Sequence, residues 1–166
     1  GRIETDHHRF QPAVANIIPP QTANSLVQTA ELTDHTGFCP VDSVTMRSTM
    51  ARDIFIIGDA AKAGEMPKTA HAASSQAKIA AAAVAADLAG QGVGPFSAVN
   101  ATYALVAPDW GFSITGVYDG GSGEIAMVKN SGGASPINAG LAYRRREAEL
   151  AEGWYRSICA DSWGQA

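Results

Sequence analysis

The stretch Asp53-Ile-Phe-Ile-Ile-Gly-Asp-Ala-Ala61 decides the fold. Its four consecutive β-forming residues predict a fully buried strand of the parallel-sheet type, which Gly58-Asp59 ends abruptly. After a short loop, an alanine-rich helix is predicted from about Thr69 to Leu88. A strand, a turn and a helix of small residues in this order are typical of part of a nucleotide-binding α/β fold.

The residues before this unit predict three short elements. The apolar run Ala13–Ile18 is closed by two prolines and predicts a buried strand that ends at a turn. Thr22–Ala30 could form a short helix, and Thr36–Asp42 reads as a loop that enters an extended segment. Within that loop Cys39 precedes a proline, which favours an extended conformation over a helical one.

The sequence pattern after Pro95 predicts a small antiparallel unit. Three short strands are predicted, at Tyr103–Val106, Phe112–Tyr118 and Glu124–Lys129, and a glycine-rich turn joins the last two. A final amphipathic helix is predicted from about Ala139 to Ala160, with Asn138 as its cap. On that helix Leu150, Trp154 and Ile158 share one predicted face.

The composition excludes several classes of function. Hydrophobic residues make up 46% of the 166 residues and charged residues 17%, which is a globular composition. The formal net charge is −4, and the one basic run, Arg144 to Arg146, is followed at once by acidic residues. This run predicts a solvated helix face, so we expect no nucleic-acid partner. No apolar run approaches the ~18 residues of a membrane span, and the two cysteines show no metal-binding spacing.

Two neighbouring features suggest a cofactor site. Asp59 follows a predicted parallel strand, at the sheet edge where open α/β folds bind ligands, and its carboxylate could accept hydrogen bonds from a polyol. Gly58 would let a ligand approach the backbone. The helix that starts near Lys68-Thr69-Ala70 offers free N–H groups and a positive dipole end to a reduced cofactor ring. The alternative interpretation is an ordinary turn with a capping aspartate.

Two further residues have a structural and a functional interpretation. Cys39 is either a redox cysteine in an extended loop or a buried cysteine that packs as a small hydrophobe. Trp154 is either a cofactor contact or, as is commoner, core packing for a terminal helix. Cys159 on the same predicted helix is expected to be structural or incidental.

Four ordered motifs resemble one known family, the FAD-binding subunit of flavocytochrome c sulfide dehydrogenase. The motifs are Val14-Ala-Asn-Ile-Ile-Pro-Pro-Gln21, Gly37-Phe-Cys-Pro-Val-Asp42, Asp53-Ile-Phe-Ile-Ile-Gly-Asp-Ala60 and Met66-Pro-Lys-Thr-Ala-His-Ala72. The tail from about Tyr103 to Trp163 looks like the carboxy-terminal domain of that family. The resemblance covers nearly the whole chain.

The resemblance implies the carboxy-terminal part of a two-dinucleotide-binding-domain FAD flavoprotein, followed by a small antiparallel β plus α tail domain. Residues 1–35 would end the second, NAD-like domain, residues 36–95 would complete the FAD-binding domain, and residues 96–166 would form the tail. The implied protein is a periplasmic enzyme that oxidises sulfide through a redox-active disulfide and passes electrons by way of FAD to a cytochrome c subunit.

The resemblance also implies roles for individual residues. Cys39 would supply one half of the redox disulfide, and it is not expected to pair with Cys159. Gly58 and Asp59 match the turn that binds the ribityl chain of FAD. Lys68, Thr69 and Ala70 match the helix start under the pyrimidine edge of the flavin. Trp154 falls where the family has a tryptophan beside the isoalloxazine.

The departures from the family predict an incomplete flavoprotein. The sequence has no G-x-G-x-x-G after a strand, no second redox cysteine at the family's position and no cysteine that would tether the flavin. We therefore expect an amino-terminal portion of the flavoprotein to complete the site, and no catalysis by this chain alone. The alternatives are a relative of sulfide:quinone oxidoreductase, whose apolar carboxy terminus this polar one does not match, and a non-catalytic assembly or docking module.

Overall fold

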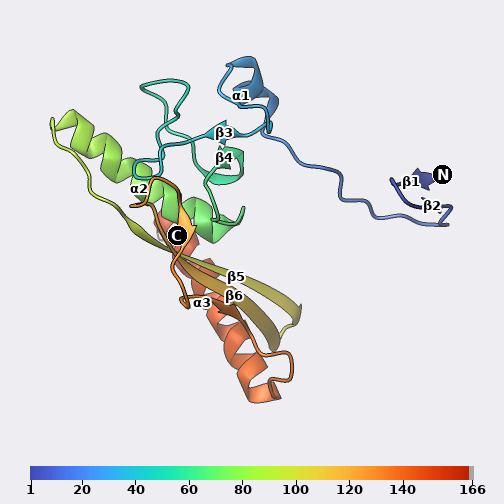
Figure 1. Ribbon diagram of the computed structural model, residues 1–166. Coiled ribbons are helices and arrows are strands. Elements are labelled where there is room, and N and C mark those ends of the chain that lie inside the picture. Colours follow the sequence, from blue (N-terminus) through green and yellow to red (C-terminus); the bar gives the residue numbers. More distant parts are fainter. Residues whose placement is uncertain (165–166) are drawn as a thin grey trace.

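The structure is a computed structural model, and it describes residues 1–164. It has a mixed α/β architecture with a long amino-terminal arm that runs away from the body (Figure 1). The helices are α1 (Ser25–Thr29), α2 (Ala70–Leu88) and α3 (Leu141–Trp163), with a short 3-10 turn at Gly58–Ala60. The strands are β1 (Ile3–Glu4), β2 (Arg9–Phe10), β3 (Cys39–Pro40), β4 (Ala61–Lys62), β5 (Ser97–Ala107), β6 (Trp110–Asp119), β7 (Ala126–Met127) and β8 (Gly133–Ala134).

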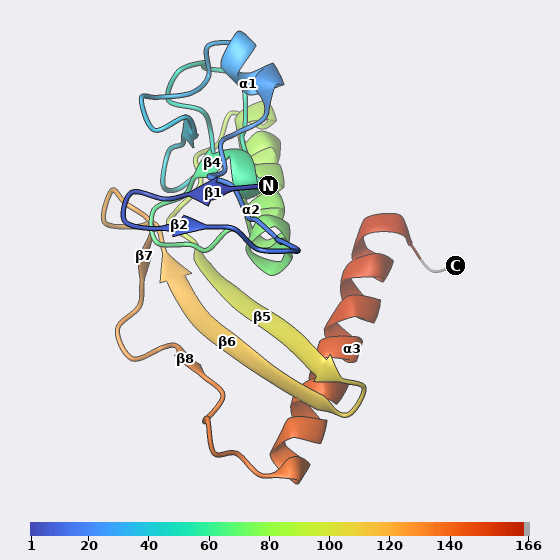
Figure 2. The ribbon, with the colours of Figure 1, turned by 90° about the vertical axis from the view of Figure 1, so that its right-hand side faces the viewer.

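A long antiparallel ribbon of β5 and β6 dominates the tail. The pairing runs from Ser97 opposite Asp119 to Ala107 opposite Trp110, and β7 and β8 both add to β6. Helix α3 packs across the ribbon (Figure 2). The approach is close at Gly111, where an added Cβ atom would lie 2.7 Å from the backbone nitrogen of Ala148. The predicted antiparallel β plus α tail is therefore confirmed, with longer strands at β5 and β6 and a shorter one at β7.

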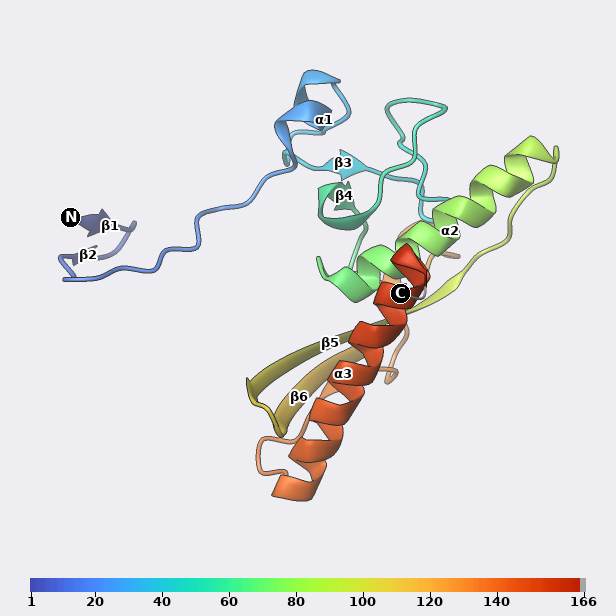
Figure 3. The same cartoon turned by 180° about the vertical axis from the view of Figure 1, so that it is seen from behind.

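Helix α2 confirms the predicted alanine-rich helix and forms one wall of the core. Its buried face consists of Ala72, Gln76, Ala80 and Ala83, at helical spacing. Small side chains on this face let β5 pack directly against the helix. The last turns of α3 also reach α2, where Lys78 pairs with Asp161 at 2.8 Å (Figure 3).

Neither of the buried strands predicted at 54–57 and 13–18 is present in the described chain. Residues 53–57 form only an isolated bridge, between Phe55 and Arg47, and Ile54 and Ile57 are 40% and 41% exposed. Within residues 1–164 the only parallel pairing is the two-residue ladder of β3 and β4, so no parallel neighbour covers this segment. Residues 13–18 carry no strand, and Ile18 is 83% exposed. A strand is defined by its partners, and the described residues provide none for either segment.

The details of α3 also differ from the prediction. The helix begins at Leu141 after Gly140, which makes no side-chain capping bond, so Asn138 is not the cap. Arg144 is buried rather than solvated, because its guanidinium donates to the carbonyl oxygens of Pro136 and Ile137 and lies over the Trp110 ring.

The face of α3 that meets the sheet was predicted only in part. Leu150 is 41% exposed, whereas Trp154 and Ile158 are half-buried. Ala148 and Ala151 are buried instead, because small side chains permit the close crossing over Gly111. None of the described helices is both long enough and apolar enough to cross a bilayer.

Candidate functional site

The Gly-Asp turn is held against α2 by a buried amide. Gly58 has a positive φ of 69°, and its N–H donates to Oε1 of Gln76 at 2.7 Å. Gln76 lies 2% exposed on the inner face of α2. Asp59 is exposed, and within residues 1–164 its carboxylate has no hydrogen-bond or ion-pair partner. The turn therefore presents a free carboxylate on a fixed backbone.

Lys68 ties the same turn to the short parallel ladder. Its ammonium donates to the carbonyl oxygens of Asp59, at 2.7 Å, and Ala61, at 2.9 Å, and lies 4.0 Å from the centre of the Phe38 ring. Burial lowers the pKa of Lys68, and the nearby Asp59 carboxylate opposes that shift. Lys68 is thus a positive charge held in place by backbone carbonyls beside the turn.

The start of α2 offers unpaired N–H donors. Thr69 is the cap, and its hydroxyl accepts from the N–H of Ala72 at 3.2 Å. The N–H groups of Ala70 and His71 have no protein acceptor among the described residues. Together with the helix dipole they favour negative charge at this point.

Trp154 meets the start of α2 although it lies on α3. Its ring stacks on His71 with the centroids 5.7 Å apart and the planes 19° apart. It also contacts Tyr103 of β5 in a tilted arrangement at 6.4 Å. Burial raises the pKa of Tyr103, and the nearby Glu147 carboxylate raises it further. The structure therefore brings together Trp154 and the predicted helix start, which are more than eighty residues apart in the sequence.

Cys39 lies in the core, with no exposed surface. It is opposite Ala61 in the parallel ladder, and both Cys39 and Cys159 are free thiols. Burial raises the pKa of the Cys39 thiol, and the positive charge of Lys68 partly offsets the rise. In the described chain the thiol is packed as a small hydrophobe, so its redox role stays a prediction.

Four residues at this site were not assigned to it by the sequence analysis. They are His71, Gln76, Asn100 and Tyr103. Gln76 carried a signal, because it is seven residues after Thr69 and so shares a face of the helix with it. The others depend on how β5 and α3 approach α2, which no local pattern specifies.

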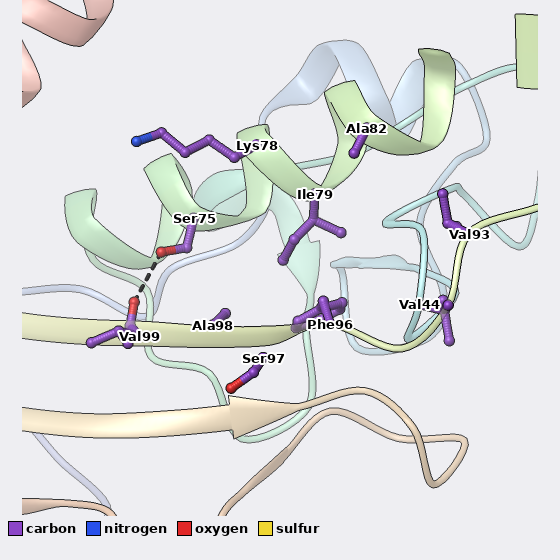
Figure 4. A pocket seen from close by; sticks show the side chains of 11 residues that line it. Val44, Ser75, Lys78, Ile79, Ala82, Val93, Phe96, Ser97, Ala98 and Val99 are labelled. Carbon is purple, nitrogen blue, oxygen red and sulfur yellow. Dashed lines mark hydrogen bonds between the residues drawn. The ribbon is translucent and has the colours of Figure 1, made fainter. Parts of the chain in front are cut away.

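A separate groove lies further along α2, beyond the first turn of the helix. It has a volume of about 440 Å³ and is lined mainly by apolar side chains of α2 and residues 93–99, including Ile79, Ala82 and Phe96 (Figure 4). None of the residues predicted to bind a cofactor lines it.

Comparison with protein families gives a match for the carboxy-terminal part of the chain. Residues 95–163, which comprise β5 to β8 and α3, match a family model described as flavocytochrome c sulphide dehydrogenase, flavin-binding. The matched segment contributes Trp154, Tyr103 and Asn100 to the site at the start of α2.

Proposed function

We propose that the protein is part of an FAD-dependent enzyme that oxidises sulfide, because residues 95–163 match a family model described as flavocytochrome c sulphide dehydrogenase, flavin-binding. The family comprises flavin-dependent oxidoreductases, and the match covers residues 96–163 of the predicted tail. The observation that carries the proposal is the stack of Trp154 on His71, which joins the matched segment to the helix start that the resemblance assigns to the flavin.

The residues at the site fit a flavin. The unpaired N–H groups of Ala70 and His71 suit the pyrimidine oxygen, where negative charge gathers in the reduced ring. The free carboxylate of Asp59 suits the hydroxyls of the ribityl chain. Gly58 suits the turn because its φ of 69° is one that residues with a Cβ atom rarely adopt. Trp154 provides an aromatic face.

When bound, FAD supplies the ability to accept an electron pair from sulfide and to release the electrons one at a time. The residues of this chain have the tasks of binding and orienting. Asp59 fixes the polyol, the start of α2 stabilises negative charge, and Trp154 positions the ring. Lys68 adds a second positive charge and keeps the Gly-Asp turn in register with Ala61.

The remaining features of the proposed enzyme follow from the resemblance. We propose that an amino-terminal portion of the flavoprotein supplies the pyrophosphate site and completes a two-dinucleotide-domain fold. Electrons would pass to a cytochrome c subunit, the partner that the family name implies, in the periplasm. A redox disulfide at Cys39 belongs to the same proposal, although the complete burial of the thiol favours a packing role.

Visible absorption of the complete flavoprotein tests the proposal. Under anaerobic conditions we expect sulfide to bleach the oxidised flavin band, and added cytochrome c to restore it. A protein purified without flavin, or a flavin that sulfide leaves oxidised, would contradict the proposal. Restoration by a quinone but not by cytochrome c would indicate the sulfide:quinone oxidoreductase alternative.

The role of Cys39 is decided by Cys39→Ser, with Cys159→Ser as the matched control. If Cys39 is half of the redox disulfide, bleaching by sulfide is lost while flavin remains bound. If Cys39 only packs, the rate for each folded molecule is kept. The unfolding free energy then falls by about 1–3 kcal/mol, because the serine buries a hydroxyl in an apolar site.

A further inference from the structure

Asn100 is the most deeply buried polar side chain at the junction of the tail and α2. It lies on β5 opposite Gly116 and is 1% exposed. A buried amide is costly unless its oxygen and nitrogen are both hydrogen-bonded. Both are engaged here, which makes the amide a fixed part of the junction.

The partners of Asn100 are the two threonines beside it. Its Oδ1 accepts from the Thr69 hydroxyl at 2.5 Å, and its Nδ2 donates to Oγ1 of Thr102 at 3.2 Å. A hydroxyl has one hydrogen to donate, and Asn100 takes the one of Thr69. The lone pairs of Thr69 are thereby directed to the N–H of Ala72, which is the capping bond of α2.

We propose that Asn100 is a positioning residue of the flavin site, which sets the cap at the start of α2 and so the direction of the unpaired N–H groups of Ala70 and His71. The inference rests on the proposed function, because it assigns those groups to the flavin. Asn100 belongs to the segment that matches the flavin-binding family, whereas Thr69 does not. The tail then acts on the cofactor by a second route besides Trp154, through the cap of a helix outside the tail.

A second hydrogen bond across the same interface provides a matched control. The Ser75 hydroxyl donates to the carbonyl oxygen of Val99 at 2.9 Å, between the same helix and the same strand. It lies more than one turn beyond the cap, so Ser75→Ala loosens the interface without altering the orientation of Thr69.

The test uses the complete flavoprotein and a double-mutant cycle of Asn100→Ala and Thr69→Val, read out as the midpoint potential of the flavin. Loss of the cap weakens the positive end of α2, so we expect each variant to shift the potential to more negative values. At a fixed poise the ratio of reduced to oxidised flavin should fall about fivefold, the size expected for one capping bond. The double variant should shift no further than either single one.

Three comparisons separate positioning from a merely structural role. Thr69→Ser keeps the hydroxyl and should restore the wild-type potential, and Ser75→Ala should leave it unchanged. If Asn100→Ala does not fold, Thr69→Val alone still carries the test, because it keeps the shape of the side chain. Potentials that stay at the wild-type value in folded Thr69→Val or Asn100→Ala would overturn the inference and leave the proposed function intact. A wild-type protein without flavin would overturn both.

Discussion

The role of Trp154 becomes apparent only from its packing in the structure. By sequence alone it is a tryptophan on an amphipathic helix, for which core packing is the commoner explanation. In the structure it is only half-buried and stacks on His71, at the first turn of α2. An aromatic ring that packs against neighbouring rings and keeps part of its surface exposed is suited to contact a further planar group.

Replacement of Trp154 by leucine should therefore slow the reduction of the flavin by sulfide. We expect the rate to decrease about two- to twelvefold, which corresponds to the ~0.5–1.5 kcal/mol of one aromatic contact. Stopped-flow absorbance of the complete flavoprotein measures it. Trp163→Leu is the control, because that tryptophan ends the same helix and is 81% exposed. Equal rates for the two variants would remove Trp154 from the site.

Asp34 offers a pH-dependent test at the scale of a residue. The Lys62 ammonium donates to its carboxylate at 2.8 Å, and with the hydroxyl and N–H of Thr36 it holds the pKa of Asp34 well below its ordinary value. Because the folded-state pKa is depressed, this stabilisation is present above the unfolded pKa of about 4 and is lost as the pH falls below it.

Asp34→Asn should accordingly lower the melting temperature at neutral pH, and its difference from the wild type should shrink as the pH is lowered from about 4 to about 2. Thermal unfolding followed by circular dichroism measures the difference. Asp109→Asn, which breaks an ion pair exposed on both sides, should have a smaller effect at neutral pH. A constant difference between Asp34→Asn and the wild type over this range would contradict the assignment.

At the scale of elements, the crossing of α3 over β6 sets the position of Trp154. Gly111→Ala would place a Cβ atom 2.7 Å from the nitrogen of Ala148 and 3.0 Å from the carbonyl carbon of Glu147. Both neighbours are backbone atoms, so the helix has to move. We expect a loss of about 1–3 kcal/mol in the free energy of unfolding, measured with denaturant, and a changed flavin spectrum.

Gly133→Ala is the matched control for the crossing. Gly133 lies in β8, which pairs with the same strand β6, and an added Cβ atom there meets nothing within 4 Å. Its free energy of unfolding should stay within about 0.5 kcal/mol of the wild type. If Gly111→Ala were equally harmless, α3 would not be held against the sheet at this point.

The elements that could be predicted from the sequence are those specified by local signals. Helix α2 has its threonine at the helix start and its alanine-rich stretch, and β5 and β6 contain the runs that predict strands at 103–106 and 112–118. The strand predicted at 54–57 is absent, because strand pairing depends on residues that are far away in the sequence. The burial of Arg144 could not be read from its charged neighbours, since the carbonyl groups that receive it belong to the loop before α3. The stacking of Trp154 on His71 could not be predicted either, because it depends on how α3 packs against α2 in the complete fold.

At the scale of the whole molecule, the amino-terminal arm is unusual because it carries large apolar side chains and yet is exposed to solvent. Residues 11–20 are all exposed, and they include three large apolar side chains, Val14, Ile17 and Ile18 (Figure 1). A run of exposed β-branched residues before two prolines is costly in water. The proposed amino-terminal portion of the flavoprotein would remove that cost by pairing with the run as a strand.

We therefore expect residues 13–18 to become protected when the flavoprotein is complete. Hydrogen exchange read by mass spectrometry should show slow amide exchange there in the complete protein and fast exchange in this chain alone. The hairpin of β1 and β2 is the internal control, because its ladder is present in this chain already. Fast exchange at 13–18 in the complete protein would show that the arm is a linker. Slow exchange would restore the predicted strand as one whose partners lie in the rest of the flavoprotein, since a ladder forms only when both strands are present.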